Sequence, residues 1–270
     1  MTPPSSASPI GAAEPSPSGV VARLRAAGCV FAEEEARLLL AEAATPAELE
    51  ALLGRRESGL PLEQVLGWAE FGGLRIRLQP GVFVPRRRTE LLLRRAAALA
   101  RPGATVLDLC CGSGAVGTAL LALVPSLAVY AADIDPAATA CARTNLEPRG
   151  GRVFTGDLFA PLPPNLRGTV DLIVANAPYV PTDDIQWMPP EARLHEARVA
   201  LDGGADGLTV QRRLVAAAGD WLAPTGYLLV ETSAGQAEHT SAIFTAHGLT
   251  PHVERSESLD ATVVVGTPHP

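Results

Sequence analysis

Lysine is absent from the 270 residues, so all 22 basic side chains are arginines, and the formal net charge is -7. Nonspecific binding to nucleic acid rests on many cationic contacts with phosphates, and a chain this acidic lacks the broad basic surface that such binding needs. The densest basic run, Arg86 to Arg88, is explained equally well by a solvated helix face and by a local contact with a partner. The composition therefore argues against nucleic acid as a partner.

Cysteine is scarce as well. The four cysteines show neither CxxC spacing nor the density of a secreted disulfide scaffold, which fits a reduced cytoplasm. The N-terminus lacks a basic start followed by an apolar core, and no apolar run reaches membrane-spanning length, so we expect neither a secretion signal nor a membrane span. Residues 1–18, rich in Pro, Ser and Ala, predict a disordered tail.

The segment after this tail has helical periodicity. Over residues 19–66, apolar side chains recur at three- and four-residue spacing, with breaks at glycine and proline. We expect a small helical module there and assign it to substrate recognition. In residues 67–85, apolar and polar side chains alternate enough to predict a β-hairpin linker. This linker leads into the main domain over residues 86–270.

In the main domain the periodicity switches repeatedly between strand and helix. Near-continuous apolar strands that alternate with helices predict an α/β, Rossmann-like fold, with a mostly parallel sheet covered by helices on both faces. Ligands bind such sheets at the carboxyl ends of the strands. We expect the last two strands to form an antiparallel edge hairpin without a neighbouring helix. The seven expected strands are 104–110, 127–133, 151–157, 170–176, 226–232, 250–254 and 262–266, and the helices are 89–100, 115–123, 136–145 and 208–222.

A glycine-rich turn follows the first strand of this sheet. Gly112, Gly114 and Gly117 match GxGxxG, a weak signal that a nicotinamide dinucleotide would also explain. Asp108 argues against that cofactor, because a carboxylate ahead of the turn repels a pyrophosphate but attracts the ammonium and sulfonium of S-adenosylmethionine. The glycines let the backbone approach the ligand closely. The turn therefore favours S-adenosylmethionine.

Two more acids end the next two strands. Asp133 is expected to accept both hydroxyls of a ribose. Its alternative role, as N-cap of the helix that begins at Pro136, suits Asp135 better. Asp157, with Leu158, is expected to lie along the edge of the adenine, although a plain strand-end turn explains Asp157 nearly as well.

Cys110 and Cys111 lie inside the glycine-rich turn and raise the question of a metal or redox site. Neighbouring side chains of a strand point to opposite faces, and no histidine lies nearby in sequence. Free cysteine commonly packs as a small apolar residue. We therefore interpret both cysteines as packing residues.

The strand over 170–176 ends in the motif "NAPY". Methyl transfer to an amide nitrogen is difficult because the lone pair is delocalised into the carbonyl. The Asn176 side-chain oxygen and the Ala177 carbonyl can accept both N–H bonds of a primary amide, and so aim the face of its nitrogen at a methyl donor. Pro178 keeps the corner extended, and Tyr179 would form a wall along the planar group. Positioning of this kind is worth roughly 7 to 11 kcal/mol.

A series of landmarks occurs in order from about Leu62 to the end of the chain. They read "GLPLEQVLG", "VFVPRRRTE", "LDLCCGSGA", "ADIDP", "GDLF", "DLIVANAPYVP", "HEARVALDGGADGL" and "GYLLVETSAGQ". In these motifs the chain resembles the HemK/PrmC family. Members of this family are class I, S-adenosylmethionine-dependent methyltransferases that modify the N5 amide of the GGQ glutamine in peptide chain release factors.

The resemblance implies a set of site residues and a partner. The partner would be a release factor, with Asn176 to Tyr179 holding its glutamine beside the donor. The residues that the resemblance implies in donor binding are Cys110, Cys111, Gly112, Ser113, Gly114, Asp133 and Leu158, and we also assign Asp108, Asp157 and Asn176 to donor binding.

The chain departs from the family pattern at two places. The usual Asn-Pro-Pro-Tyr has Ala177 at its second position, which keeps the carbonyl and loses rigidity worth only about 0.4 to 1 kcal/mol. The usual Pro-Glu/Asp before Thr89 is Arg87-Arg88. The second departure lies closer to where a protein substrate would dock, so it bears on the partner more than on the chemistry.

Three other functions stay open. Adenine N6-methyltransferases use a similar corner, because an exocyclic amine is also a planar, conjugated NH2 group, but they need a basic surface to hold a flipped base. A catalytically silent S-adenosylmethionine-binding protein is disfavoured by the retention of Asn176, Pro178 and Tyr179. A methyltransferase for a small amide or amine would need a closed pocket.

Four further side chains near the corner are conspicuous. His195 is expected on the surface of a connecting segment. Trp187 and Met188 are expected to cap the pocket or to pack. Glu231 either ends its strand near the substrate or has a structural role.

Overall fold

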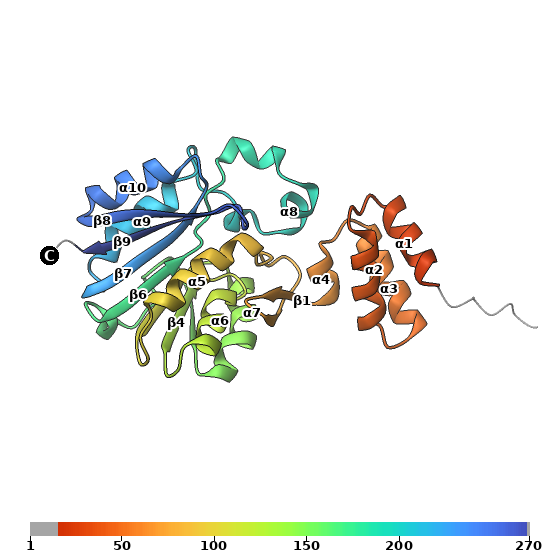
Figure 1. Ribbon diagram of the computed structural model, residues 1–270, viewed down its shortest axis with the longest axis horizontal. Helices are drawn as coiled ribbons and strands as arrows, with labels where there is room; N and C mark the ends of the chain where they lie inside the picture. Colours follow the sequence, from red (N-terminus) through yellow and green to blue (C-terminus); the bar gives the residue numbers. More distant parts are fainter. Residues whose placement is uncertain (1–15, 269–270) are drawn as a thin grey trace, which may run out of the picture. The chain divides into compact units, whose positions relative to one another are not determined.

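The computed structural model describes residues 16–268, in two units that meet in sequence between Leu66 and Gly67 (Figure 1). Most of the predicted tail, residues 1–15, lies outside the described residues. Its last two residues, Pro17 and Ser18, instead form the first turn of a helix, which the Ser16 hydroxyl caps by accepting from the Gly19 N–H. Within the described residues, no helix is both long and apolar enough to cross a bilayer.

The N-terminal unit consists of helices with a core of their own. Its helices are α1 (Pro17–Ala26), α2 (Ala32–Glu42), α3 (Pro46–Glu57) and α4 (Leu62–Leu66). Leu24, Leu39 and Leu53 are fully buried between them. Arg56 and Glu35 form a buried ion pair, with Arg56 Nε 2.6 Å from Glu35 Oε2. This pair links α3 to α2 inside the unit.

The second unit is built on a seven-stranded sheet in the order β5-β4-β3-β6-β7-β9-β8. The first five strands in this order are parallel, and β9 and β8 are antiparallel at one edge, which confirms the predicted fold class and the edge hairpin. The strands are β3 (Thr105–Leu109), β4 (Ala128–Asp133), β5 (Arg152–Thr155), β6 (Val170–Ala175), β7 (Leu222–Thr232), β8 (Leu249–Ser256) and β9 (Ala261–Pro268).

Helices cover both faces of this sheet, as predicted (Figure 1). Alternate side chains of β3 show the two cores: Val106 packs with α5 to α7, whereas Leu107 and Leu109 pack with α9 and α10. The helices are α5 (Glu90–Leu99), α6 (Ala115–Leu123), α7 (Pro136–Leu146), α8 (Pro190–His195), α9 (Thr209–Ala218) and α10 (Ala237–Ala246).

Two predictions at the C-terminal end of this unit were wrong. The helix expected over 208–222 ends at Ala218, because Leu222 already belongs to β7. The edge hairpin was expected to lack a neighbouring helix, but α10 lies directly before β8. Its sequence is rich in Thr and Ser, which have modest helix propensity, so burial of Phe244 and Ala237 decides its conformation.

A separate two-stranded hairpin precedes the main sheet. Strands β1 (Trp68–Phe71) and β2 (Leu74–Arg77) pair across Gly72 and Gly73, whose φ values of +57° and +75° suit a tight hairpin turn. The Asn145 side chain on α7 bonds the Arg77 N–H and carbonyl and the Ser113 carbonyl, each at 2.9 Å. This amide therefore fixes the hairpin against the glycine-rich turn.

The ion pair inside the N-terminal unit gives a stability test. Replacing Arg56 with Ala leaves the Glu35 carboxylate buried without its partner, and breaking such a pair costs about 3 to 5 kcal/mol. The matched control is Arg23→Ala, because Arg23 pairs with Glu50 and Glu57 at the surface, where such pairs contribute about 0 to 1 kcal/mol. The free energy of unfolding of both variants is measured in urea, with hydrogen exchange of α2 and α3 as the readout. Equal losses in the two variants would contradict the buried pair.

Candidate active site

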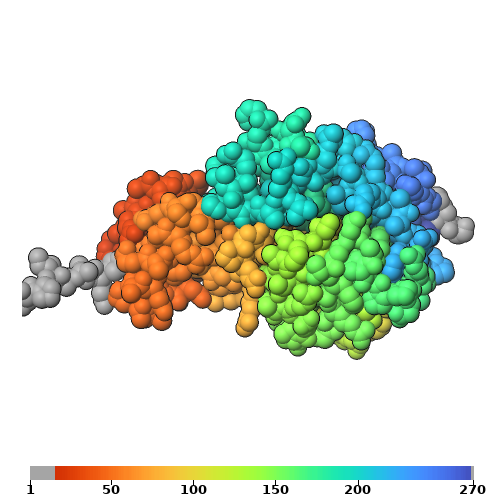
Figure 2. Space-filling view, turned by 180° about the vertical axis from the view of Figure 1, so that it is seen from behind, coloured from red at the N-terminus to blue at the C-terminus, as the bar shows by residue number. Residues whose placement is uncertain are grey.

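A cavity of about 430 Å³ lies where the parallel strands end. The segment between β6 and α9, teal to cyan, lies against the green part of the same unit around β4 and β5 (Figure 2). Twelve of the predicted site residues line the cavity, namely Asp108, Cys110, Cys111, Gly112, Ser113, Asp133, Asp157, Leu158, Asn176, Ala177, Pro178 and Tyr179. Gly114 is the exception: it packs against α7, where a Cβ would lie 2.8 Å from Leu146.

The glycine-rich turn presents its backbone to this cavity. Gly112 has a φ of +55°, and a Cβ placed there would meet no atom within 4 Å, so the space in front of it is open. Its N–H donates to Asp133 Oδ2 at 2.8 Å. Cys110 also adopts a left-handed conformation, with φ 56°, which is costly for a residue with a side chain. The turn is thus held in an unusual shape that leaves room for a ligand.

Acidic side chains line the same part of the cavity. Asp108 Oδ2 accepts from the Gly117 N–H at 2.9 Å, and burial raises the pKa of Asp108 from 3.8 to about 7. Burial also raises the pKa of Asp133, against the effect of N–H donors from Asp135 and Gly112. Asp135 caps α7 by accepting from the Ala137 N–H, so the N-cap alternative for Asp133 is excluded. A cavity of this charge suits a cationic ligand.

The acid after the third parallel strand in the chain has an ion-pair partner that the sequence did not reveal. Asp157, after β5, forms an ion pair with Arg213 of α9, and Arg213 also lines the cavity. Leu158 beside it has a φ of +47°. The pair closes one side of the cavity next to an apolar side chain.

The two cysteines of the turn differ in their surroundings. Both cysteines line the cavity; Cys111 also belongs to the core under α6, as predicted, whereas Cys110 is half-buried and lies outside that core, contrary to the prediction. Burial raises the pKa of both thiols, and the charges of Asp133 and Asp108 raise it further. Both thiols are therefore protonated at neutral pH and are poor nucleophiles.

The corner after β6 carries two candidate acceptor oxygens on residues that line the cavity. Asn176 Nδ2 donates to Thr89 Oγ1 at 3.2 Å, and none of the described residues donates to Asn176 Oδ1. In the described chain, the Ala177 carbonyl takes part in no turn or loop hydrogen bond. Ala177 as a whole residue is only 1% exposed, although it lines the cavity.

A buried carboxylate lies behind this corner. The side chain of Glu231, on β7, is 1% exposed, and the Tyr179 hydroxyl donates to its Oε1 at 3.4 Å. Arg88 Nε lies 3.7 Å from the same oxygen, and its guanidinium lies 6.0 Å from the centre of the Tyr179 ring. Burial and the Glu231 charge raise the pKa of Tyr179 to about 12, so its hydroxyl remains a donor.

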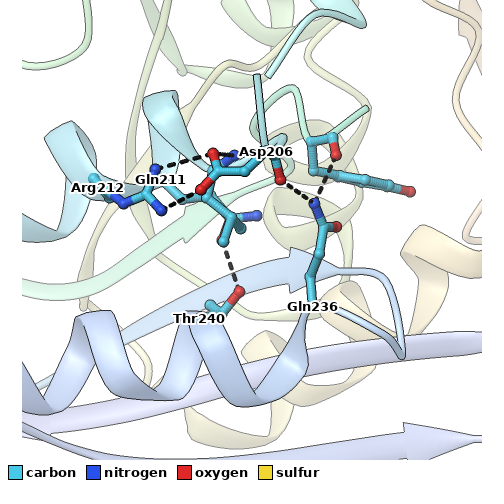
Figure 3. Close-up of polar contacts among 7 residues, drawn as sticks. Asp206, Gln211, Arg212, Gln236 and Thr240 are labelled. Carbon is cyan, nitrogen blue, oxygen red and sulfur yellow. Dashed lines mark hydrogen bonds and ion pairs between the residues drawn. The ribbon is translucent and has the colours of Figure 1, made fainter. Parts of the chain in front are cut away.

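A second support holds the corner from the side of α10 (Figure 3). Gln236 Nε2 donates to the carbonyls of Tyr179 and Asp206, at 3.0 and 3.1 Å. Gly207 approaches so closely that a Cβ there would lie 2.3 Å from the Tyr179 carbonyl oxygen. The Asp206–Arg212 ion pair, and the bond from Thr240 Oγ1 to Gln211 Oε1 at 2.9 Å, tie the same loop to α9 and α9 to α10.

The basic run near the corner is turned inward in part. Arg86 Nη2 lies 2.6 Å from Oε1 of the buried Glu196, which also accepts from the Val84 N–H. Arg86 and Arg88 both line the cavity; Arg86 is half-buried, so the solvated helix face considered for this run is wrong at Arg86, whereas the Arg88 side chain is 44% exposed. The structural reason is that each arginine neutralises a buried acid.

The remaining conspicuous residues divide between surface and cavity. Trp187 is 79% exposed at the end of a 3-10 helix (Thr182–Trp187), so it neither caps the pocket nor packs, contrary to the prediction. Met188, the next residue, lines the cavity. His195 is half-exposed at the end of α8 and is not part of the cavity lining.

The fold and this site define a class I, Rossmann-like methyltransferase, and the acidic cradle with open space at Gly112 fits S-adenosylmethionine as its methyl donor. Residues 73–210 match the family described as methyltransferase small domain. A release factor glutamine methyltransferase of Geobacter sulfurreducens is 42% identical over 208 residues, covering 75% of this chain and 72% of that protein. The chain belongs to this family, of HemK/PrmC type, which confirms the resemblance.

Relatives of other kinds share parts of the chain. A 4-amino-L-phenylalanine/4-methylamino-L-phenylalanine methyltransferase of Streptomyces pristinaespiralis is 38% identical over 205 residues, covering 73% of this chain and 70% of that protein. A solved methyltransferase from Pyrococcus furiosus has the same fold, with a TM-score of 0.56 and 17% identity, covering 80% of this chain and 96% of that one.

The raised pKa of Asp108 predicts a pH dependence of stability. Between pH 3.8 and about 7 the folded protein holds a proton that the unfolded chain releases, so stability without ligand falls as pH rises through this window. The slope reaches about 1.4 kcal/mol per pH unit. Asp108→Asn should reduce this slope of stability against pH, whereas Asp220→Asn, which removes an acid from an exposed ion pair, should leave the slope unchanged. Urea unfolding at pH 5 and 7 measures the difference, and parallel curves for D108N and wild type would refute it.

Proposed function

We propose that this protein transfers a methyl group from S-adenosylmethionine to the side-chain amide nitrogen, N5, of a glutamine in a peptide chain release factor. The observation that carries the proposal is the corner after β6, whose residues line the cavity and where neither Asn176 Oδ1 nor the Ala177 carbonyl has a hydrogen-bond donor among the described residues. A primary amide has two N–H donors in one plane, which match these two acceptors. The names of the most similar relatives agree with such an acceptor.

The donor side of the cavity is assigned to the acids and the glycine-rich turn. We assign Asp108 to the positive end of the donor, Asp133 to its ribose hydroxyls, and Asp157 with Leu158 to its adenine. Gly112 lets the backbone come close to the ligand. The donor supplies a methyl group on a sulfonium, which is electrophilic without further activation.

The acceptor side holds and orients the nitrogen. Asn176 and Ala177 fix the amide plane, so that the face of its nitrogen, which carries the delocalised lone pair, is aimed at the donor. The Tyr179 ring lies along the plane as a wall. A methylated, cationic amide nitrogen loses its proton readily, so no protein base is required in this scheme.

The rest of the chain is assigned by the same proposal. The helical unit over residues 19–66 would recognise the protein substrate, and residues 67–85 would lead into the methyltransferase domain over 86–270. We place the protein in the cytoplasm, because its four cysteines, all within the described residues, form no disulfide.

A second candidate is methylation of a small amine that carries a carboxylate. It is favoured by Arg86 and Arg88, whose guanidinium groups line the cavity and could bind a carboxylate. The relative from Streptomyces pristinaespiralis is named for an amino acid substrate of this kind. Arg88 replaces the Glu or Asp of the family pattern, so this chain carries an extra cation there.

Competing substrates decide between the two candidates. The purified protein is incubated with labelled S-adenosylmethionine and either release factors or 4-amino-L-phenylalanine, and products are mapped by peptide and small-molecule mass spectrometry. Label on the GGQ glutamine is the expected result. Label on the free amine alone would replace the first candidate with the second, and label on neither would remove both.

Asn176 gives the sharpest test of the acceptor corner. Asn176→Ala removes one of the two acceptors, and misplacing a reacting group by about 1 Å costs on the order of 100-fold in rate. We expect at least this loss in methyl transfer, with donor binding by calorimetry nearly unchanged. Asn165→Ala, at an exposed asparagine, is the control and should retain full activity. Loss of donor binding together with transfer would contradict the assigned role.

A further inference from the structure

Gln236, at the start of α10, is a side chain to which the proposed chemistry gives no role. It does not line the cavity, but its Nε2 donates to the carbonyl of Tyr179, the last residue of the acceptor corner, at 3.0 Å. The same nitrogen donates to the Asp206 carbonyl at 3.1 Å (Figure 3). Within residues 16–268, neither carbonyl has another hydrogen-bond donor. Both carbonyls therefore depend on one side chain.

We propose that Gln236 is a positioning residue for methyl transfer, and that Ser233 sets the direction of its amide. Gln236 touches neither substrate nor methyl donor; it acts through Tyr179, whose carbonyl it holds. The proposal rests on the proposed function, in which the corner from Asn176 to Tyr179 holds the acceptor amide.

The direction of the Gln236 amide follows from the groups around it. A carbonyl can only accept, so the two carbonyls require the NH2 end of the amide, with one proton for each. The Oε1 end then meets the hydroxyl of Ser233, which directly follows β7. This hydroxyl donates to Gln236 Oε1 at 2.8 Å and accepts from the Gln236 N–H at 3.2 Å. An amide turned the other way would direct its oxygen at two carbonyl oxygens, so Ser233 selects the orientation that holds the corner.

The peptide unit between Tyr179 and Val180 is the point at which Gln236 acts. Its carbonyl accepts from Gln236, and its N–H, on Val180, donates to the Leu201 carbonyl at 3.1 Å. Without Gln236 only the second bond remains, so the unit gains freedom to rotate. Because the ring of Pro178 fixes its own φ, that residue cannot absorb such a rotation, and the Tyr179 ring must move. In the proposed function this ring is the wall along the acceptor amide.

Buried polar contacts anchor the helix that carries Gln236. The Thr240 hydroxyl, one turn further along α10, donates to Gln211 Oε1 on α9 at 2.9 Å (Figure 3). It also lies 3.2 Å from the Thr232 hydroxyl at the end of β7. All three residues are buried. Gln236 is therefore held by a helix that is itself fixed to α9 and to the sheet.

Gln236→Glu removes the two N–H donors with almost no change of shape. A carboxylate cannot donate, so both carbonyls lose their donor and face a negative charge. We expect kcat to fall on the order of 100-fold, with unchanged affinity for the methyl donor in calorimetry. Protonation returns one O–H donor to the introduced carboxyl, so the gap between variant and wild type should narrow as pH is lowered. Gln79→Glu, at an exposed glutamine after β2, is the matched control and should keep wild-type kcat.

Ser233→Ala tests the orientation of the amide and leaves Gln236 itself in place. Loss of one hydrogen bond of ordinary strength predicts a fall in kcat of about fivefold. Ser233→Thr keeps the hydroxyl and should keep wild-type kcat. In a Gln236→Ala background, S233A should cause no further loss, because Ser233 acts only through the amide. Additive losses in this double-mutant cycle would contradict the pairing of the two residues.

A readout without substrate separates this inference from the proposed function. The carbonyl carbon resonances of Tyr179 and Asp206, detected through the N–H groups of Val180 and Gly207, should shift in Q236E and S233A but not in Q79E. Wild-type kcat in Q236E, an affinity for the methyl donor that falls together with kcat, or an unmoved Tyr179 resonance would each overturn the positioning role. If wild type methylates neither a release factor nor an amine, the proposed function fails, and the carbonyl resonances alone decide the inference.

Discussion

Parallel strands end at one edge of a sheet, and the arrangement of the site depends on this constraint. Asp108 is the last residue but one of β3, Asp133 ends β4, and Asp157 and Asn176 come after β5 and β6. Residues far apart in sequence therefore meet around one cavity. The order β5-β4-β3-β6 places the glycine-rich turn between the acids and the corner. The order of the strands thus brings the sites proposed for donor and acceptor next to each other.

The two sides of the cavity differ in whether the protein itself places a positive charge beside their acids. On the side proposed for the donor, the buried Asp108 and the half-buried Asp133 have no arginine partner among the described residues, and burial raises the pKa of both carboxyls because it disfavours their charged form. On the acceptor side, Arg86 and Arg88 lie against the buried acids Glu196 and Glu231. In the proposed function, the cationic methyl donor would supply the missing positive charge on the first side, and the protein supplies it itself on the second.

The parts of the site that lie within short motifs could be predicted from the sequence. A strand, a glycine turn and a terminal acid leave a local pattern, and so does a rigid corner such as "NAPY". The contact of Thr89 and Glu231 with that corner leaves none, because these residues come from separate segments that only the folded chain brings together. Gln236 and Arg213 were missed for the same reason. Helix α10 was missed because packing of Phe244, not its own propensity, makes it helical.

The close approach of Gly207 to Tyr179 has a consequence for how such a site can change during evolution. The bend that holds the acceptor and the loop from Gly203 to Gly207 form one stiff body, locked by Gln236, so neither can be reshaped without the other. New acceptors must then be accommodated outside this body. Such changes fit residues 181–200, part of which lines the cavity and in which Trp187 and Leu194 are exposed. Substitutions there would alter which acceptors the proposed site takes without altering the bend.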